Sequence, residues 1–339
     1  MRAVVMYGTG DVRVDQTERP KLAEPTDAII KLAATCICGS DLWPYRGADD
    51  VDHQPMGHEY VGVVEEIGAA VRNVQVGDFV VGSFFSSDNT CEICQAGYQT
   101  HCVHRGPGAI PGAQAEFARI PHADGTLVAT PGTPEPDLIP SLLAASDVLG
   151  TGWFAAVAAE VGPGKTVAVV GDGAVGLLGV LAAKQLGAER IIAMSRHVDR
   201  QSLARELGAT DIVEERGDAG VERIKELTGG LGAHSTIEAV GTQESMMQAI
   251  RATRAGGHVG YVGVSHGVSL PGQELFFSCV HLHGGPAPVR RFLPELITLI
   301  WDRQIDPGKV FDLTLPLDQA ADGYRAMDER RATKVLLTL

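Results

Sequence analysis

The chain has 339 residues, of which 45% are hydrophobic and 21% charged, and its formal net charge is −14. This length predicts two domains with sizeable cores, and the negative charge argues against a nucleic-acid or anionic-membrane partner. The start lacks the apolar segment of a secretory signal, and no stretch approaches the roughly 18 uncharged apolar residues of a spanning helix. We therefore expect a cytoplasmic protein whose six cysteines serve metal binding or chemistry rather than disulfides.

The first part of the chain, residues 1–135, is rich in glycine, proline and short β-branched runs. Runs at 27–35, 60–68 and 78–85 are separated by turn residues. Short strands punctuated in this way are typical of a β-rich domain.

Residues able to bind a metal are spread through this part and just beyond it. Cys38 lies in CGSD, His58 and Glu59 lie in PMGHEY, and Asp147 lies in AASDVLGTGW. A thiolate, an imidazole and carboxylates suit Zn²⁺, and ligands drawn from several loops are typical of a catalytic site with one open position. Spacing alone does not select these residues, because a histidine beside a glutamate is more often structural.

Three further cysteines, Cys91, Cys94 and Cys102, share one polar loop. A closed tetrahedral metal site needs four ligands, and a disulfide needs two thiols. These three residues by themselves therefore complete neither arrangement.

From about residue 150 to 285, short apolar strands alternate with helices. This rhythm predicts a parallel sheet covered on both faces. The expected strands are 166–170, 190–194, 211–214, 234–240, 258–264 and 280–284, and helices are expected near 199–207, 219–228 and 243–254.

The sequence GDGAVG forms a G-x-G-x-x-G motif directly after an expected strand and at the start of a helix. In that context the motif predicts a dinucleotide site, with glycines for the tight turn, the approach of the pyrophosphate and helix packing. The helix N-terminus would face the phosphate charge. The candidate contacts are Gly171, Gly173, Ala174, Val175 and Gly176.

The end of the second expected strand indicates which dinucleotide binds. NAD sites usually carry an acidic residue there, but no carboxylate lies between Glu189 and Asp199. Ser195 and Arg196 occupy this position, and Arg200 follows one helical turn later. Because a guanidinium suits a 2′-phosphate, we predict NADP, with a solvated basic surface as the alternative.

The end of the chain has one helix-like run at 290–303 and strand-like runs at 310–315 and 334–339. We expect this tail to return to the first domain. The predicted domains are 1–148 with 286–339, and 149–285.

Five motifs together resemble those of the zinc-dependent medium-chain alcohol dehydrogenases, within the medium-chain dehydrogenase/reductase superfamily. The resemblance implies an α/β protein with a GroES-like β-rich catalytic domain, a Rossmann domain and an active site in the cleft between them. The motifs are CGSD at 38–41, GHE at 57–59, the loop 88–102, GTGW at 150–153 and GDGAVG at 171–176.

The resemblance also implies roles for the candidate metal ligands. Cys38, His58 and Asp147 match the catalytic zinc ligands, and Glu59 matches a carboxylate that binds or approaches the metal. Asp41 matches the acid that orients the zinc-bound histidine.

Ser40 matches the hydroxyl that hydrogen-bonds the substrate oxygen and accepts its proton, although serine is also a common turn residue. Many members have a relay histidine where this chain has Trp43, which cannot exchange a proton at neutral pH. We predict that Trp43, Phe84 and Trp153 shape a pocket for apolar or aromatic substrates. Core packing is the alternative for these aromatic residues.

The structural-zinc loop of the family spaces four ligands in steps of three, three and eight. The first position falls on an aspartate here, and a carboxylate can complete a zinc site. His101 and His104 are rival ligands, and an empty or partly oxidised loop is the alternative. The predicted ligands are Asp88, Cys91, Cys94 and Cys102.

These observations predict an alcohol dehydrogenase, or a ketone or aldehyde reductase, that uses zinc and NADP(H) and acts on a small-molecule alcohol or carbonyl compound. The family resemblance implies a homo-oligomer, dimer or tetramer, and Lys334 is a further candidate contact for the cofactor phosphates. The alternatives are a zinc-free quinone or enoyl reductase of the same architecture and a non-catalytic NADPH-binding protein.

Overall fold

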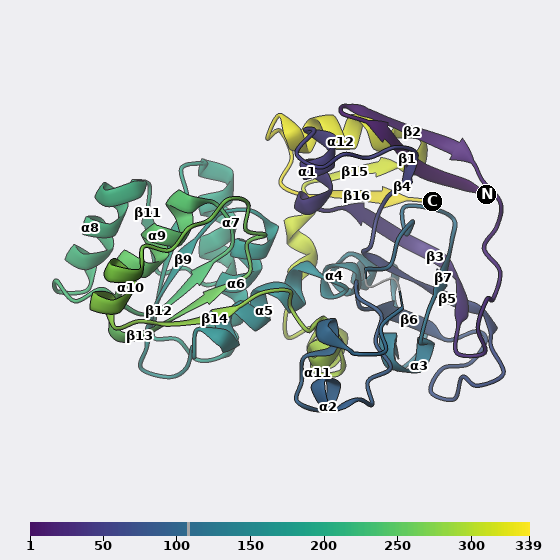
Figure 1. Ribbon diagram of the computed structural model, residues 1–339, viewed down its shortest axis with the longest axis horizontal. Helices are drawn as coiled ribbons and strands as arrows, with labels where there is room; N and C mark the ends of the chain where they lie inside the picture. The colour runs from purple at the N-terminus through teal and green to yellow at the C-terminus, as the bar shows by residue number, and fades with distance from the viewer. Residues whose placement is uncertain (107–108) are drawn as a thin grey trace. The chain divides into compact units, whose positions relative to one another are not determined.

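The computed structural model describes residues 1–106 and 109–339. The chain divides into two compact units (Figure 1). The first unit contains Met1–Gly150 and Pro288–Leu339, and the second, the Rossmann unit, contains Thr151–Ala287. The expected α/β fold, with one β-rich unit and one parallel-sheet unit, is confirmed.

The first unit contains two sheets. One has the strand order β2-β1-β4, and the larger one has the order β15-β16-β3-β5-β6-β8, with β7 also paired to β3. The strands are β1 (Arg2–Gly8), β2 (Asp11–Gln16), β3 (Ala28–Ile37), β4 (Gln54–Pro55), β5 (Tyr60–Ile67), β6 (Phe79–Gly82), β7 (Phe117–Ile120), β8 (Leu127–Ala129), β15 (Leu313–Pro316) and β16 (Val335–Thr338).

Short helices connect these strands, and α5 crosses from the first unit into the Rossmann unit. The helices are η1 (Gly39–Asp41), α1 (Leu42–Tyr45), α2 (Glu92–Gln95), η2 (Gln99–His101), α3 (Ala123–Thr126), η3 (Pro136–Leu138), α4 (Ile139–Ala145), α5 (Val148–Ala158), α11 (Val289–Trp301), η4 (Pro307–Val310), η5 (Leu317–Gln319) and α12 (Ala320–Asp328).

The strand expected at 310–315 is partly wrong, because β15 begins only at Leu313. The residue before it, Asp312, uses its carboxylate to accept the backbone N–H groups of Thr333 and Lys334. This contact holds the residue that precedes β15 beside the two residues that precede β16.

Strand pairing in the larger sheet brings distant segments together. Thr35 of β3 lies opposite Tyr60 of β5 in an antiparallel register. The residues that follow β3 therefore lie beside those that precede β5. On the other side of β3, Val335 of β16 lies opposite Ile37. Three segments with predicted functional residues therefore meet at the C-terminal end of β3.

The Rossmann unit has one six-stranded sheet of order β11-β10-β9-β12-β13-β14, and all its pairings are parallel. Helices α8 and α9 lie on one face and α5, α6 and α7 on the other (Figure 1). The elements are β9 (Thr166–Val170), α6 (Ala174–Gln185), β10 (Arg190–Met194), α7 (Val198–Leu207), β11 (Asp211–Val213), α8 (Gly217–Leu227), β12 (Ala233–Glu238), α9 (Gln243–Ala252), β13 (Thr253–Tyr261), α10 (Gly272–Ser278) and β14 (His281–Gly284).

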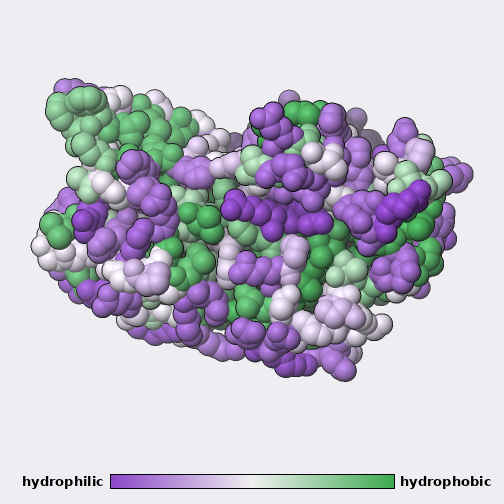
Figure 2. All heavy atoms as spheres, turned by 90° about the horizontal axis from the view of Figure 1, so that it is seen from below, coloured by the Kyte–Doolittle hydropathy of each residue, from purple (hydrophilic) through white to green (hydrophobic). Residues whose placement is uncertain are grey.

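The Rossmann unit also exposes large apolar side chains in α10 and in the segment between β13 and α10. These include Val264, Leu270, Phe276 and Phe277, and Figure 2 shows hydrophobic side chains gathered at the left, where this unit lies. Exposed apolar clusters of this kind mark interaction surfaces.

Among the described residues, no single helix is long and apolar enough to cross a membrane. One bent pair, Pro136–Ala145 with Val148–Ala158, passes the same test by length and composition only.

Candidate active site and metal centres

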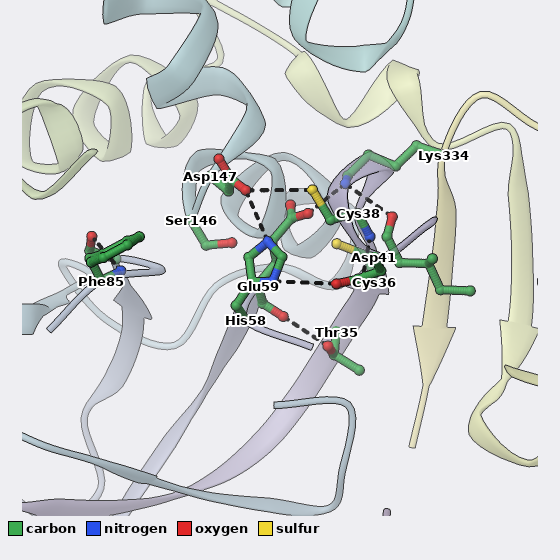
Figure 3. A network of polar contacts seen from close by, with 12 residues as sticks. Thr35, Cys36, Cys38, Asp41, His58, Glu59, Phe85, Ser146, Asp147 and Lys334 are labelled. Carbon is green, nitrogen blue, oxygen red and sulfur yellow. Dashed lines mark hydrogen bonds and ion pairs between the residues drawn. The ribbon is translucent and has the colours of Figure 1, made fainter. Parts of the chain in front are cut away.

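Four predicted ligands from three segments of the first unit meet at one point. Each of Cys38, His58, Glu59 and Asp147 offers one donor atom, and these atoms all lie within 4.8 Å of one another. Asp147 comes from the link between α4 and α5, and its Oδ2 lies 3.3 Å from His58 Nε2 and 3.7 Å from Cys38 Sγ. Figure 3 shows these three side chains pointing toward one another.

Asp41 holds His58 from the side away from this cluster. Its Oδ1 lies 3.5 Å from His58 Nδ1, and its Oδ2 accepts the backbone N–H of Cys38 at 2.9 Å. Gln114 also donates to this Oδ2 at 3.0 Å and is itself held by the hydroxyl of Tyr324. An imidazole whose Nδ1 faces a carboxylate presents Nε2 to a metal. Sequence reasoning missed Gln114 and Tyr324, which belong to no motif.

Glu59 and Lys334 form a fully buried ion pair beside the cluster. Lys334 Nζ lies 2.7 Å from Glu59 Oε1 and also donates to the carbonyl of Ile37. The two residues are 0% and 1% exposed, respectively. The predicted contact between Lys334 and the cofactor phosphates therefore needs correction, because the ammonium is already engaged by Glu59 in the interior of the first unit.

The donor set of this cluster fits Zn²⁺. Burial raises the pKa of the Cys38 thiol, and the nearby carboxylates of Glu59 and Asp147 raise it further. The other carboxylate oxygen of Glu59, Oε2, is buried with no hydrogen-bond partner among the described residues. A divalent cation would displace protons from this cluster and offset its concentrated negative charge.

The second predicted metal site also assembles in space. Donor atoms of Asp88, Cys91, Cys94 and Cys102 all lie within 4.8 Å of one another. Cys91 caps the short helix α2, and the backbone N–H of Cys94 lowers the pKa of Cys91 to about 7. Burial raises the pKa of Cys94 and Cys102. The loop therefore gathers three thiols and a carboxylate in a geometry that suits a tetrahedral ion, which would displace the thiol protons.

His104 contacts Asp88 rather than the thiols. Its Nδ1 lies 2.6 Å from Asp88 Oδ2, while Asp88 Oδ1 lies 3.2 Å from Cys102 Sγ. Although burial opposes the charged form, the backbone N–H of Thr90 and the His104 side chain hold the pKa of Asp88 well below its usual range. The geometry thus gives His104 the place of a partner that orients the carboxylate.

The glycine motif has the geometry that a phosphate-binding turn requires. Gly171 follows β9 with φ of 119°, and Gly173 is the N-cap of α6. A Cβ on Gly176 would lie 2.1 Å from the carbonyl oxygen of Gly171, whereas no atom lies within 4 Å of a Cβ on Gly173. Gly176 therefore permits close packing of helix and strand, and Gly173 leaves open space beside the helix N-terminus, whose first residues are Ala174 and Val175.

The side chains after β10 are organised by Asp172, which sequence reasoning did not single out. Asp172 accepts a hydrogen bond from the Ser195 hydroxyl at 2.8 Å and pairs with Arg200 at 3.2 Å. Arg216 approaches the same carboxylate at 3.7 Å. Ser195 is fully buried, so the structure makes Ser195 and Arg200 partners of Asp172. Arg196, by contrast, is exposed and has no polar partner among the described residues.

Comparison with known proteins identifies the family. The model of the alcohol dehydrogenase GroES-like domain matches residues 24–132, and that of the zinc-binding dehydrogenase matches residues 174–300. The zinc-type alcohol dehydrogenase B of Aspergillus flavus is 34% identical over 349 residues, covering 99% of this chain and 81% of that protein. The chain belongs to the zinc medium-chain dehydrogenase/reductase family.

Two further relatives are similar to this medium-chain dehydrogenase over almost its whole length. The NADP-dependent isopropanol dehydrogenase of Thermoanaerobacter brockii is 33% identical over 325 residues, covering 91% of each chain. The solved structure of the alcohol dehydrogenase TADH from Thermus sp. ATN1 superposes with a TM-score of 0.90 at 32% identity, over 100% of this chain and 99% of that one.

The predicted substrate-pocket residues of this medium-chain dehydrogenase lie in different surroundings. The rings of Phe84 and His58 are 6.0 Å apart, edge to face, so Phe84 borders the metal-ligand cluster. Ser40 lies in η1, two residues after Cys38, and is half-buried, as is Trp43 in α1. Trp153 is only 3% exposed within α5, as expected of a core residue, and its predicted place in the pocket stays a prediction.

Proposed function

We propose that this alcohol dehydrogenase is zinc-dependent and interconverts alcohols with ketones or aldehydes using NADP(H). The observation that carries the proposal is the convergence of Cys38, His58, Glu59 and Asp147, with Asp41 behind the imidazole. A zinc-free quinone or enoyl reductase would have no use for such a cluster.

The residues of the chain would divide the work as follows. Cys38, His58 and Asp147 would hold zinc, which when bound supplies a Lewis acid that lowers the pKa of an alcohol. Asp41 keeps Nε2 of His58 directed at the metal position. Ser40 would hydrogen-bond the substrate oxygen and accept its proton. Because Trp43 cannot take that proton on, we infer that it leaves through water, while Trp43 and Phe84 favour apolar or aromatic substrates.

A substrate panel tests this function directly. Purified enzyme with measured zinc content should oxidise secondary alcohols and reduce ketones or aldehydes with NADP(H) faster than with NAD(H). Full activity with far less than one zinc per chain would support the zinc-free reductase instead. Tight NADPH binding without turnover of any compound would support the non-catalytic alternative.

The NADP preference rests on Arg196, whose guanidinium has no partner in the described structure and is free to pair with a 2′-phosphate. The similarity to an NADP-dependent relative points the same way. Arg196→Ala should weaken NADPH binding about 10-fold or more, because a charge-assisted hydrogen bond is lost, while NADH binding stays unchanged. Equal loss for both cofactors, measured by fluorescence titration, would contradict this assignment. Arg223→Ala removes a charge from an exposed ion pair and is the matched control.

We also propose that Asp88, Cys91, Cys94 and Cys102 hold a second, structural zinc ion. Metal analysis should find two zinc ions per chain, and Asp88→Cys should retain both and slow zinc loss to a chelator, because thiolate is the softer ligand. His104→Ala should also retain both ions, since His104 contacts the carboxylate. One zinc per chain, with Cys91 and Cys94 alkylated in the native enzyme, would show that the loop is empty.

We infer a dimer or tetramer, since α10 and the segment before it expose large apolar side chains, and β14, which follows α10, is an edge strand. Sedimentation equilibrium at micromolar concentration tests this, and a monomer would contradict it. The cytoplasmic location remains a prediction.

A further inference from the structure

A polar hollow lies within the first unit, between the cysteine loop and the start of α11. It has a volume of about 360 Å³, and Asn89, Gln95, Gly97, Gln99, Arg290 and Arg291 are among the residues that line it. Figure 1 shows α2 beside α11. The contact is close, because a Cβ on Gly97 would lie 3.2 Å from the Arg291 side chain. Cys94, a predicted ligand of the second metal site, also lines the hollow, whereas the residues named above belong to neither the predicted metal sites nor the cofactor site.

The hollow concentrates positive charge that the protein leaves uncompensated. Arg290 and Arg291 occupy the first turn of α11, where the helix dipole already disfavours cations. Neither guanidinium forms an ion pair within the described part of the chain, although the chain carries 42 acidic residues. Burial lowers the pKa of Arg290. Arg290 is partly buried without a carboxylate, and Arg291 lies exposed beside it. A partly buried, unpaired cation indicates that an anion is the missing partner.

Two buried polar atoms of the lining residues are also unsatisfied. Arg290 Nε, a donor, and Gln99 Oε1, an acceptor, have no hydrogen-bond partner among the described residues. Gln99 is only 7% exposed. Its Nε2 donates to the Asn89 side-chain oxygen at 3.0 Å and to the Cys94 carbonyl at 3.3 Å, which fixes the orientation of the amide and leaves Oε1 as an acceptor. Because buried polar groups are almost always satisfied, a ligand that satisfied both atoms would accept one hydrogen bond and donate another.

We propose that this hollow binds a phosphate group that retains one proton. The guanidiniums of Arg290 and Arg291 would pair with its charged oxygens, for which their planar donor geometry is suited. The remaining P–OH would donate to Gln99 Oε1. Sulfate has the same shape and charge as hydrogen phosphate but carries no proton at neutral pH, so it would place an oxygen lone pair against that of Gln99.

Isothermal titration calorimetry with inorganic phosphate and with sulfate tests the proposal. The titrations use the zinc-loaded, full-length Arg196→Ala variant at constant ionic strength, so that phosphate binding by Arg196 does not contribute, and a saturating concentration of NAD⁺ occupies the glycine turn. Phosphate should bind, and sulfate should bind about tenfold or more weakly, the cost of an unsatisfied buried acceptor. Methyl phosphate, whose second pKa is about 6, has mostly lost its P–OH at neutral pH and should bind more weakly than phosphate, so its titration distinguishes free phosphate from a phosphate monoester as the natural ligand.

Variants in the same background locate the site. Arg291 is exposed, so Arg291→Gln should fold normally and should lower phosphate affinity about tenfold or more. Gln99→Met should remove the discrimination between phosphate and sulfate, with thermal melting as the check of folding. Arg223→Gln, the matched loss of charge elsewhere, should leave phosphate affinity unchanged.

Equal affinity for phosphate and sulfate, an unchanged affinity in Arg291→Gln, or no binding at millimolar phosphate would each overturn the proposal. These outcomes are distinguishable from a failure of the proposed function, because turnover of alcohols and ketones is measured without phosphate in the buffer.

Discussion

Asp147→Asn is expected to reduce the rate of alcohol oxidation by about three orders of magnitude or more, since it weakens the binding of the zinc ion on which the chemistry depends. Asparagine keeps the size of the side chain but removes the charge that faces His58 Nε2 and Cys38 Sγ. Loss of a direct ligand should weaken zinc binding by more than the 10- to 100-fold typical of residues behind the ligands. Metal analysis after dialysis and steady-state kinetics measure the two effects.

Asp147→Cys is the matched control, because a cysteine thiolate is also a zinc ligand. This variant should keep a bound zinc ion and a substantial part of the activity. If Asp147→Asn instead kept full activity and zinc content, Asp147 would not be a ligand. A fully active enzyme that had lost its zinc would favour the zinc-free reductase.

Lys334→Met is expected to lower the free energy of unfolding by about 3–5 kcal/mol, because it leaves the Glu59 carboxylate buried without its partner. Both side chains are completely enclosed, so water cannot replace the lost contact. Urea denaturation of the metal-free protein measures the effect without interference from zinc binding.

The double variant Glu59→Gln with Lys334→Met is the decisive control. Removing both charges should recover most of the stability, since the cost arises from one unpaired charge and not from lost packing. If the double variant were no more stable than Lys334→Met alone, the ion pair would not explain the loss. Arg325→Met, in an exposed pair with Asp322, should change stability by less than about 1 kcal/mol.

The glycine turn between β9 and α6 could be predicted from local sequence, because it depends on backbone geometry. The contact between Gly176 and the Gly171 carbonyl leaves no room for a side chain. The presence of glycine at these positions therefore indicates the turn. Alternation of apolar runs and helices likewise indicated the parallel sheet, since buried parallel strands are continuously apolar. Boundaries were less certain: β13, expected to begin near residue 258, begins at Thr253.

Predicting the metal-ligand cluster required the residue motifs, and explaining it required the tertiary structure. Residue chemistry and family motifs singled out Cys38, His58 and Asp147. Only strand register explains why the first two meet, because β3 and β5 pair antiparallel with Thr35 opposite Tyr60. The pairing of β16 with β3 places Lys334 in the interior of the first unit. The sequence had instead suggested that this residue near the C-terminus contacts the cofactor.

The sequence by itself determined which chemical groups are present and which local turns they can form: thiols, imidazoles and carboxylates for a metal, glycines for a dinucleotide. The tertiary structure alone decided the partners of each charge. Asp172 draws in Ser195 and Arg200, Lys334 takes Glu59, and Arg290 is left without a counter-charge. Pairing between charges depends on distances across the fold, and residues far apart along the chain carry no local signal of where packing will place them.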